Sequence, residues 1–466
     1  MEFDLMDNLR KDITQTIIGL VLFVMMISLS FFYTDDPHTY YGLALLFLAV
    51  YMWILTPISY IFTTFMLISF SVLLGIFQPE NAFGGFASST IFFLMGAFIL
   101  ALTVQKHNLH KRIALEFLKR FGDSPKSFIL GITLVGSLLS MMMPAHGVAA
   151  LFIPILLGIF TAYKKDIFDT DFVKASLLAL SYGTSVGSMG TLLGGARNPL
   201  AIGIYYQETG KQISFLGWFI AAIPLVIFMT VMVYLVLTKI FDIEKIDMES
   251  IQVQIKDEVE ELGALSKGEK KAMFFLVLAF LSWAIWGQIY GMGVIAVLIT
   301  VIIAMTKTVS WEDIAKRLPW GMIFLYGGAI SLALILSEAG TLLFVTETLL
   351  TFVGDNPFLV LALFAVIAVF LSNVMSNAAT TAVILPIGIS VMVVIGFSEL
   401  IPVYTIALAS AFAFMLPVGT PSAALVYTTG HLEMKDFIKA GFILNIIGIL
   451  SFLTIGLGWW RLLGLW

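Results

Sequence analysis

The chain is a succession of apolar segments long enough to cross a bilayer, and this pattern limits it to membrane folds. A transmembrane helix needs roughly 20 mostly apolar residues. With 60% hydrophobic and 12% charged residues, the 466-residue chain has too little polar surface for a water-soluble globule. We predict an all-α polytopic membrane protein with about eleven transmembrane helices. The predicted spans are residues 13–33, 41–56, 58–77, 89–105, 173–206, 213–240, 271–286, 289–306, 319–338, 402–429 and 437–460.

The composition and net charge also limit the kinds of partner that the chain is expected to have. The chain has no cysteine, which excludes disulfides and thiolate metal sites, and its net charge is only −5. Without a long basic run there is no sign of a nucleic-acid partner. The expected partners are the lipid bilayer, a small solute and a second copy of the chain.

Two further apolar stretches, residues 127–162 and 358–397, are interrupted in the middle by Pro, Gly, Ser, Asn or His. Each therefore fits two half-helices of a re-entrant hairpin better than two full spans. With hairpins at these positions and a cytoplasmic N-terminus, nearly all basic loop residues fall on the cytoplasmic side. This asymmetry predicts a plasma (cytoplasmic) membrane protein with its N-terminus inside.

The sequence repeats itself at an offset of 232 positions. At this offset 91-IFFLMGAFILAL-102 matches 323-IFLYGGAISLAL-334 at seven of twelve positions, and Pro125, Ser140 and Pro154 meet Pro357, Ser372 and Pro386. The two matching spans run in opposite directions in the predicted topology. Inverted repeats with broken helices at matched positions are typical of secondary transporters.

The second interruption, 372-SNVMSNAATTAVILP-386, gathers hydroxyl and amide side chains in apolar sequence. A half-helix that begins here presents free N–H groups to an anion, and the end of the preceding half presents carbonyls to a cation. The alternative is that these small polar residues only bridge helices. A later span in each half is also broken, at 190-GTLLGGARNPLA-201 and at 416-LPVGTPSAALVY-427. We expect two hairpin tips and two unwound loops around one chamber.

Together these motifs resemble the divalent anion/sodium symporter (DASS, INDY-type) family of dicarboxylate, tricarboxylate and sulfate carriers. The resemblance covers nearly the whole chain and is carried by 91-IFFLMGAFILALTVQKHNLHKRIAL-115, 376-SNAATTAVILP-386 and 410-SAFAFMLPVGTPSAA-424. It implies that Ser376, Asn377, Ala378, Thr420 and Pro421 line the substrate site. It also implies a second-half sodium site made by Ser372, Asn377 and the carbonyls of Met375 and Gly419. Ala378 replaces the motif threonine, so one hydroxyl contact is missing.

The first half departs from the family pattern. Pro144, Ala145 and His146 stand where the Ser-Asn-Thr motif is expected, and the loop reads 194-GGARN-198. Only Ser140 and Gly194 remain of the first sodium site, as a doubtful remnant. His146, Gly195 and Arg197 become the first-half candidates for substrate contact.

Arg197 and His146 each allow two interpretations. A charge inside a span costs about 2.5–3.5 kcal/mol on insertion scales and usually serves a function. We hypothesise that the Arg197 guanidinium supplies the positive charge of the lost sodium; alternatively, it snorkels to an interface or pairs with an acid. His146 either contacts the anion at a half-helix tip, with or without proton coupling, or is a hydrogen-bonded packing residue.

The resemblance implies a scaffold domain (1–122 and 271–355), a transport domain (123–242 and 356–466), a cytoplasmic linker (243–270), a homodimer and an elevator-like movement. The predicted function is secondary active transport of a small divalent anion, sodium-coupled with one sodium site lost. Alternatives are a sodium-independent exchanger, a proton-coupled carrier or, in other classes, an anion channel or a membrane enzyme. No catalytic motif supports an enzyme. Na⁺ is the one expected coupling ion, and no organic cofactor is expected.

Overall fold

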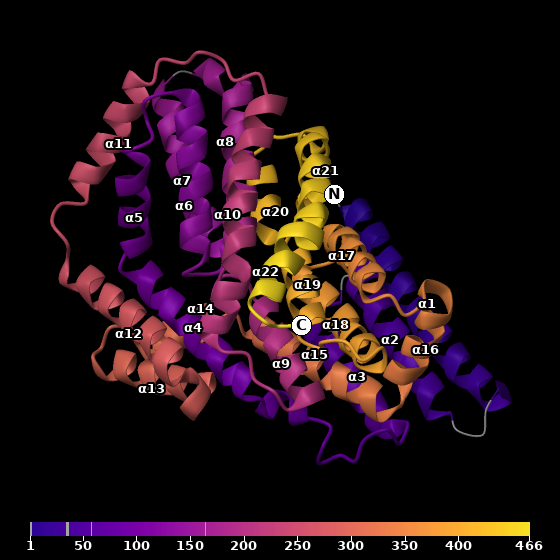
Figure 1. Ribbon diagram of the computed structural model, residues 1–466. Coiled ribbons are helices and arrows are strands. Elements are labelled where there is room, and N and C mark those ends of the chain that lie inside the picture. The colour runs from indigo at the N-terminus through magenta and orange to yellow at the C-terminus, as the bar shows by residue number, and fades with distance from the viewer. Residues whose placement is uncertain (1, 34–36, 57, 164) are drawn as a thin grey trace.

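The computed structural model describes residues 2–33, 37–56, 58–163 and 165–466 (Figure 1). Over these ranges every regular element is helical. Nine helices in the described part are long and apolar enough to cross a membrane. The prediction of an all-α polytopic membrane protein is confirmed.

The first half of the chain forms α1 to α10. Their bounds are α1 (Glu2–Tyr33), α2 (His38–Leu55), α3 (Tyr60–Leu73), η1 (Gly84–Ala87), α4 (Ser89–Lys106), α5 (Leu109–Leu118), α6 (Pro125–Ser140), α7 (Ala145–Tyr163), η2 (Lys165–Asp169), α8 (Asp171–Gly187), α9 (Arg197–Thr209) and α10 (Phe215–Ile240).

The second half forms α11 to α22. Their bounds are α11 (Glu249–Glu261), α12 (Lys267–Tyr290), α13 (Met292–Met305), α14 (Trp311–Arg317), α15 (Trp320–Glu338), α16 (Thr341–Val353), α17 (Pro357–Val374), α18 (Asn377–Val394), α19 (Ile401–Ala409), η3 (Pro417–Gly419), α20 (Pro421–Tyr427), α21 (Met434–Ser451), η4 (Phe452–Gly456) and α22 (Leu457–Leu462).

Helix starts follow local capping chemistry. Ser124 and Asn356 each accept hydrogen bonds from the first turn of the helix that follows, and each is followed by a proline at the first helical position. Proline fits there because its missing N–H would have no intrahelical acceptor. α6 and α17, the helices that precede the two predicted interruptions, therefore begin in the same way and 232 positions apart.

Both predicted interruptions separate two helices. α6 ends at Ser140 and α7 begins at Ala145, whereas α17 ends at Val374 and α18 begins at Asn377. α7 and α18 thus also begin 232 positions apart, in the register of the sequence repeat. We call residues 141–146 the first tip and residues 375–378 the second tip.

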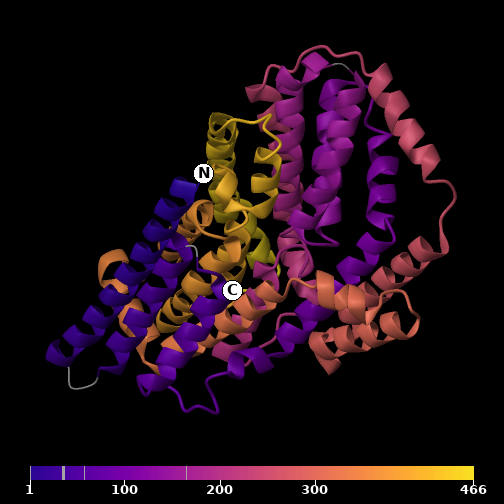
Figure 2. The ribbon, with the colours of Figure 1, turned by 180° about the vertical axis from the view of Figure 1, so that it is seen from behind.

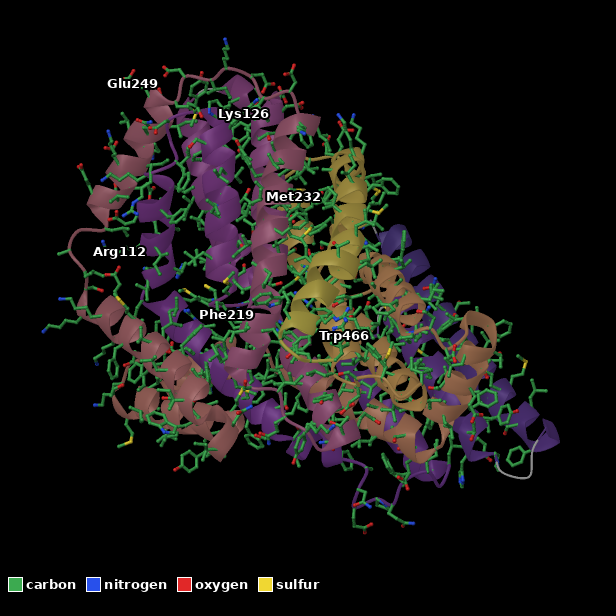
Figure 3. All side chains as sticks on the ribbon, viewed as in Figure 1. Arg112, Lys126, Phe219, Met232, Glu249 and Trp466 are labelled. Carbon is green, nitrogen blue, oxygen red and sulfur yellow. The ribbon has the colours of Figure 1, made fainter. Side chains whose placement is uncertain are left out.

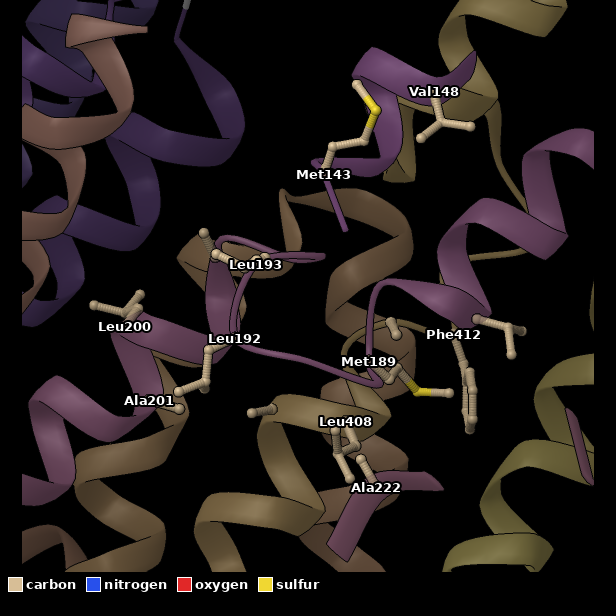
Figure 4. Close-up of a cluster of buried hydrophobic side chains, with 14 of the residues drawn as sticks. Met143, Val148, Met189, Leu192, Leu193, Leu200, Ala201, Ala222, Leu408 and Phe412 are labelled. Carbon is tan, nitrogen blue, oxygen red and sulfur yellow. The ribbon is translucent and has the colours of Figure 1, made fainter. Parts of the chain in front are cut away.

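The two later breaks are also present as unwound backbone. Residues 188–196 join α8 to α9, and residues 410–420, which contain η3, join α19 to α20. We call them the first loop and the second loop. Figure 4 shows how apolar side chains anchor the first loop: Leu192 and Leu193 lie near α9, and Met189 points toward the chain around Leu408 and Phe412.

The helices pack in two groups (Figures 1 and 2). α4 packs against α13, and α3 packs against α2 and α15. In the other group α8 packs against α6, α7, α10 and α20, and α18 packs against α9, α17 and α19. The groups meet where α15 contacts α9 and α18. Most side chains on the outside of this assembly are apolar, as Figure 3 and the many exposed Ile, Leu, Val and Phe residues show.

The stretch expected as a linker, residues 243–270, contains the packed helix α11. Its side chains Ile251, Ile255 and Val259 are buried against α5 and α7. Lys111 of α5 pairs with Glu258, and Arg112 bonds to Glu269 and to the carbonyls of residues 262–264. The neighbouring carboxylate raises the pKa of Arg112, so this clamp stays charged.

Candidate functional site

A cavity of about 370 Å³ lies where the two tips and the two loops converge. One wall comes from the tips and loops themselves. The opposite wall comes from the other group of helices, through Trp53, Tyr60, Met322 and Leu325. A single chamber shared by both halves is thus present in the fold.

The structure brings all the candidate substrate residues to this cavity. Its lining includes His146, Gly195, Arg197, Ser376, Asn377, Ala378, Thr420 and Pro421. Of the candidate sodium residues, Gly194, Met375, Asn377 and Gly419 line it as well. Ser140 and Ser372 do not; both are fully buried behind the tips.

The second tip is polar and partly unsatisfied. The Ser376 hydroxyl caps α18 by accepting from the Ala379 N–H at 3.2 Å. The Asn377 side-chain oxygen is buried and has no hydrogen-bond partner among the described residues. An unpaired buried amide oxygen is costly, typically about 1–3 kcal/mol, so a cation at this point would relieve a real penalty. The groups that could bind a cation here are uncharged oxygens, which suit a hard monovalent cation.

The second loop is fixed by its own side chains. The Thr420 hydroxyl accepts from the Ala423 N–H at 3.1 Å and so caps α20. Asn373, a residue not selected from the sequence, accepts from the Met415 N–H at 2.9 Å and ties the loop to α17. Ser410 lies 3.3 Å from Thr381 of α18. The tip and the loop are therefore held together as one unit.

The first tip is closed by the protein itself. Pro144 offers no side-chain cap to α7, and the Ala145 N–H donates to the Gly194 carbonyl at 3.3 Å. That carbonyl is the one expected to face the first sodium. The Ser140 hydroxyl and the Asn198 side-chain oxygen are buried without a partner among the described residues, but Pro144 and Ala145 add no oxygen-bearing side chain.

Arg197 lies at the first position of α9 and is only 4% exposed. Its Nε donates to the Ala407 carbonyl at 2.8 Å, and its Nη2 donates to the Ser188 hydroxyl at 2.9 Å. A methyl group built on Gly195 would lie 2.7 Å from Nη1, so the guanidinium packs closely against the first loop. No ion pair joins Arg197 to an acid in the described part of the chain. Snorkelling and acid pairing, the alternatives considered above, do not describe this side chain.

His146 is half-buried in the cavity wall, and no hydrogen bond to its ring is found within the described ranges. The packing alternative therefore lacks the hydrogen bond that it requires. Sequence reasoning missed Ser185, Ser188 and Ser422 in the lining. Ser185 lies in the last turn of α8 and Ser188 is the first residue of the first loop, and this position beside the predicted break was the available signal.

The whole chain matches one family. The model for the sodium:sulfate symporter transmembrane region matches residues 10–466. The chain belongs to this family. It is 30% identical over 472 residues to the sodium-dependent dicarboxylate transporter SdcS of Staphylococcus aureus strain MRSA252, covering 95% of this chain and 91% of that protein. SdcS of strain bovine RF122 is also 30% identical, covering 94% and 90%.

Solved structures of other transporters share the fold. The Neisseria gonorrhoeae MtrF structure, titled as illuminating a class of antimetabolite efflux pumps, gives a TM-score of 0.58 at 13% identity and covers 85% of this chain and 84% of that chain. The Alcanivorax borkumensis YdaH transporter gives 0.53 at 14% identity, with coverages of 85% and 87%. The predicted family and membrane-transporter class are confirmed, and the matching family and relatives are those of transporters.

Proposed function

We propose that the chain is a secondary active transporter of a small anion of the dicarboxylate or sulfate class, coupled to sodium at the second-half site alone. The observation that carries the proposal is the unlike pair of tips on one cavity. The second tip retains a polar cradle with the unpaired Asn377 oxygen. At the first tip the Gly194 carbonyl is occupied by a protein N–H, and Arg197 lies in the adjoining loop.

The proposed anion contacts are Ser376, Asn377, Thr420 and Pro421, with the backbone at Ala378. Free N–H groups at the start of α18 and the positive end of its dipole favour an anion there. His146, Gly195 and Arg197 complete the opposite side. Sodium is the co-transported cation, held by Ser372, Asn377 and the carbonyls of Met375 and Gly419.

The carrier would work as a homodimer in the cytoplasmic membrane, with its N-terminus inside, by an elevator-like movement. The moving part would be residues 123–242 and 356–466, against a scaffold of residues 1–122 and 271–355. The support is that the cavity has tips and loops on one wall and Trp53, Tyr60, Met322 and Leu325 on the other. Sliding one wall past the other would expose the anion to the opposite side.

The test is uptake of labelled succinate, malate and sulfate into proteoliposomes at a series of sodium concentrations. The expected result is sodium-dependent uptake with a Hill slope of about one, because a single dissociable cation site remains. Uptake without sodium, but driven by internal anion, would instead show an exchanger in which Arg197 has replaced all coupling cations. A Hill slope near two would show that the first site still binds sodium.

A further inference from the structure

A second cavity, of about 340 Å³, lies at the other end of α9 from the cavity of the candidate site. We call it the far cavity and the first one the near cavity. The last turns of α9 and the turn after it form one wall of the far cavity, and the starts of α4 and α13 form the other. Like the near cavity, it therefore lies between the proposed moving part and the proposed scaffold.

The sequence repeat relates the two cavities. On the scaffold side, the near cavity is lined by Trp53, Tyr60, Gly321, Met322 and Leu325. At the offset of 232 positions, all of these except Trp53 have a counterpart that lines the far cavity, namely Met292, Ser89, Thr90 and Phe93. The offset was obtained from sequence identities alone, so the agreement between the two linings is an independent observation.

This agreement has a mechanical meaning in an inverted repeat. Equivalent residues of such a repeat face opposite sides of the membrane and take equivalent places in the two end states of alternating access. In this structure Gly321, Met322 and Leu325 lie across the near cavity from the tips and loops. In the other end state, the same tips and loops would lie across from Ser89, Thr90 and Phe93.

The length of the required shift follows from α9. A methyl group built on Gly203 would lie 3.3 Å from Oγ1 and Cγ2 of Thr90, so this part of α9 now faces Thr90. Ala196 has helical backbone angles and lies seven positions earlier, on the same face of the helix. At 1.5 Å per residue, a shift of about 10 Å along α9 brings Ala196, and the near cavity that it lines, level with Thr90.

The scaffold wall of the far cavity carries hydroxyl groups that the near wall lacks. Ser89 and Thr90 stand at the positions equivalent to Gly321 and Met322. The Thr90 N–H donates to the Ser88 hydroxyl at 3.3 Å, but no hydrogen bond from the Ser89 or Thr90 hydroxyl is found within the described ranges. Both hydroxyls are free to donate to an anion, and hydrogen bonds to charged groups are roughly twice as strong as neutral ones.

We infer that the far cavity becomes the anion cavity in the second end state, and that the Ser89 and Thr90 hydroxyls donate hydrogen bonds to the anion there. This rests on the proposed function and adds two binding residues to its site. With the N-terminus inside, as proposed, the start of α4 lies at the outer face. The anion is therefore bound more tightly from outside than from inside, where Gly321 and Met322 offer no donor.

Exchanging the wall residues tests the contact. Ser89→Gly with Thr90→Met gives the far wall the side chains of the near wall. We expect KM for succinate to rise about tenfold in right-side-out membrane vesicles and to stay unchanged in inside-out vesicles, because only the outer site loses its donors. Gly321→Ser with Met322→Thr is the matched variant, and it should lower KM about threefold or more in inside-out vesicles alone.

Two results of this experiment would overturn the inference. KM changes of equal size in both vesicle preparations would mean that the substitutions act on the whole protein and not on one end state. Unchanged KM in both would mean that the two hydroxyls do not contact the anion. If the unaltered chain transports neither succinate nor sulfate, the proposed function fails, and cross-linking then tests the far cavity separately.

Cysteine cross-linking tests the shift without a transport measurement. The chain has no cysteine of its own, so only an introduced pair can react. Thr90→Cys with Gly203→Cys is the control pair, because these positions are in contact in this structure. Thr90→Cys with Ala196→Cys should form a disulfide only after the shift of about 10 Å, because the two Cα atoms of a disulfide lie within about 7 Å of each other.

We expect both pairs to cross-link when an oxidant is added to membranes that contain sodium and succinate. In the Ala196 pair, the disulfide should stop succinate uptake, and a reductant should restore it. If the control pair cross-links and the Ala196 pair does not, with or without sodium and succinate, the near cavity never reaches Thr90 and the inference is wrong. Normal uptake by the unoxidised variants would in that case leave the proposed function standing.

Discussion

The two tips begin their second half-helices at equivalent positions of the repeat, yet they satisfy their backbone in opposite ways. At the second tip a serine side chain caps α18 and a buried amide oxygen is left without a partner. At the first tip a proline provides no cap, and the first N–H of α7 bonds to the adjoining loop. The same architecture therefore leaves an oxygen without a partner on one side and makes an internal backbone contact on the other.

Arg197→Gln should have the largest effect. Glutamine removes the positive charge and leaves the Ala407 carbonyl without its charged donor. Hydrogen bonds to charged groups contribute about 1.5–3 kcal/mol each, so kcat/KM should fall by about a hundredfold. The measurement is initial uptake against sodium concentration in proteoliposomes. Ser188→Ala is the control, because it removes one bond and keeps the charge. Unchanged uptake and an unchanged sodium slope would remove Arg197 from the mechanism.

Alanine substitutions at Gly194 of the first loop and Gly419 of the second loop should lower the stability of the protein by different amounts. A methyl group on Gly194 would lie 2.1 Å from the Ser140 carbonyl oxygen, whereas one on Gly419 would lie 2.9 Å from the nearest atom, the Ala413 Cβ. Gly194→Ala should destabilise the protein by about 2–3 kcal/mol and Gly419→Ala by about 1 kcal/mol. Thermal unfolding of both variants in the same detergent measures this. Equal shifts would mean that the first loop is not packed against the first tip.

Asn377→Ala should weaken sodium binding and leave the stability of the protein nearly unchanged. It removes a buried amide oxygen that lines the cavity and has no partner among the described residues, so the sodium concentration for half-maximal uptake should rise about tenfold. Ala145→Asn, at the equivalent first-tip position, is the matched variant and should leave that concentration unchanged. Sodium-dependent thermal stabilisation reports both. If Ala145→Asn shifted the curve as strongly, the first tip would still bind the cation.

His146→Ala should have the smallest effect. We expect KM to rise about threefold with kcat nearly unchanged, because one hydrogen bond to a neutral group is worth about 0.5–1.5 kcal/mol. The pH profile of uptake should not change, because the proposed function assigns no proton coupling to this ring. A flattened pH profile in this variant would instead assign proton coupling to the imidazole.

The sequence was most informative where the backbone is broken by residue types with few alternatives. Pro125, Pro357 and the polar run at 372–381 predicted both interruptions and the register of the repeat, because proline and clustered polar residues rarely lie inside a membrane helix without cause. The hydrogen-bond partners of Arg197 could not be predicted from residue type. Ala407 contributes only a carbonyl, which every residue has, and Ser188 is one serine among several near the end of α8.

Helix α11 is a second case in which the sequence did not predict how a segment packs. Its acidic run indicates a solvated segment, but three apolar residues at helical spacing bury one face against α5 and α7. Three apolar residues are a weak indication of burial in a segment with so many charges. Their burial depends on the neighbouring helices, which the sequence of this segment does not reveal. Asn373 was passed over for a similar reason, since its role depends on Met415, which lies beyond the next helix pair.

Under the proposed mechanism, Arg197 would travel with the moving part in both directions, because it is attached to the chain, and it would never be released on the far side. A dissociable ion contributes its gradient on every cycle, whereas a tethered cation contributes none. With one sodium ion per cycle and no membrane potential, the steepest anion ratio that the carrier could sustain would follow the first power of the sodium ratio. A carrier of this kind would give up concentrating power and would in return keep working in dilute salt, where a second ion site would stand empty.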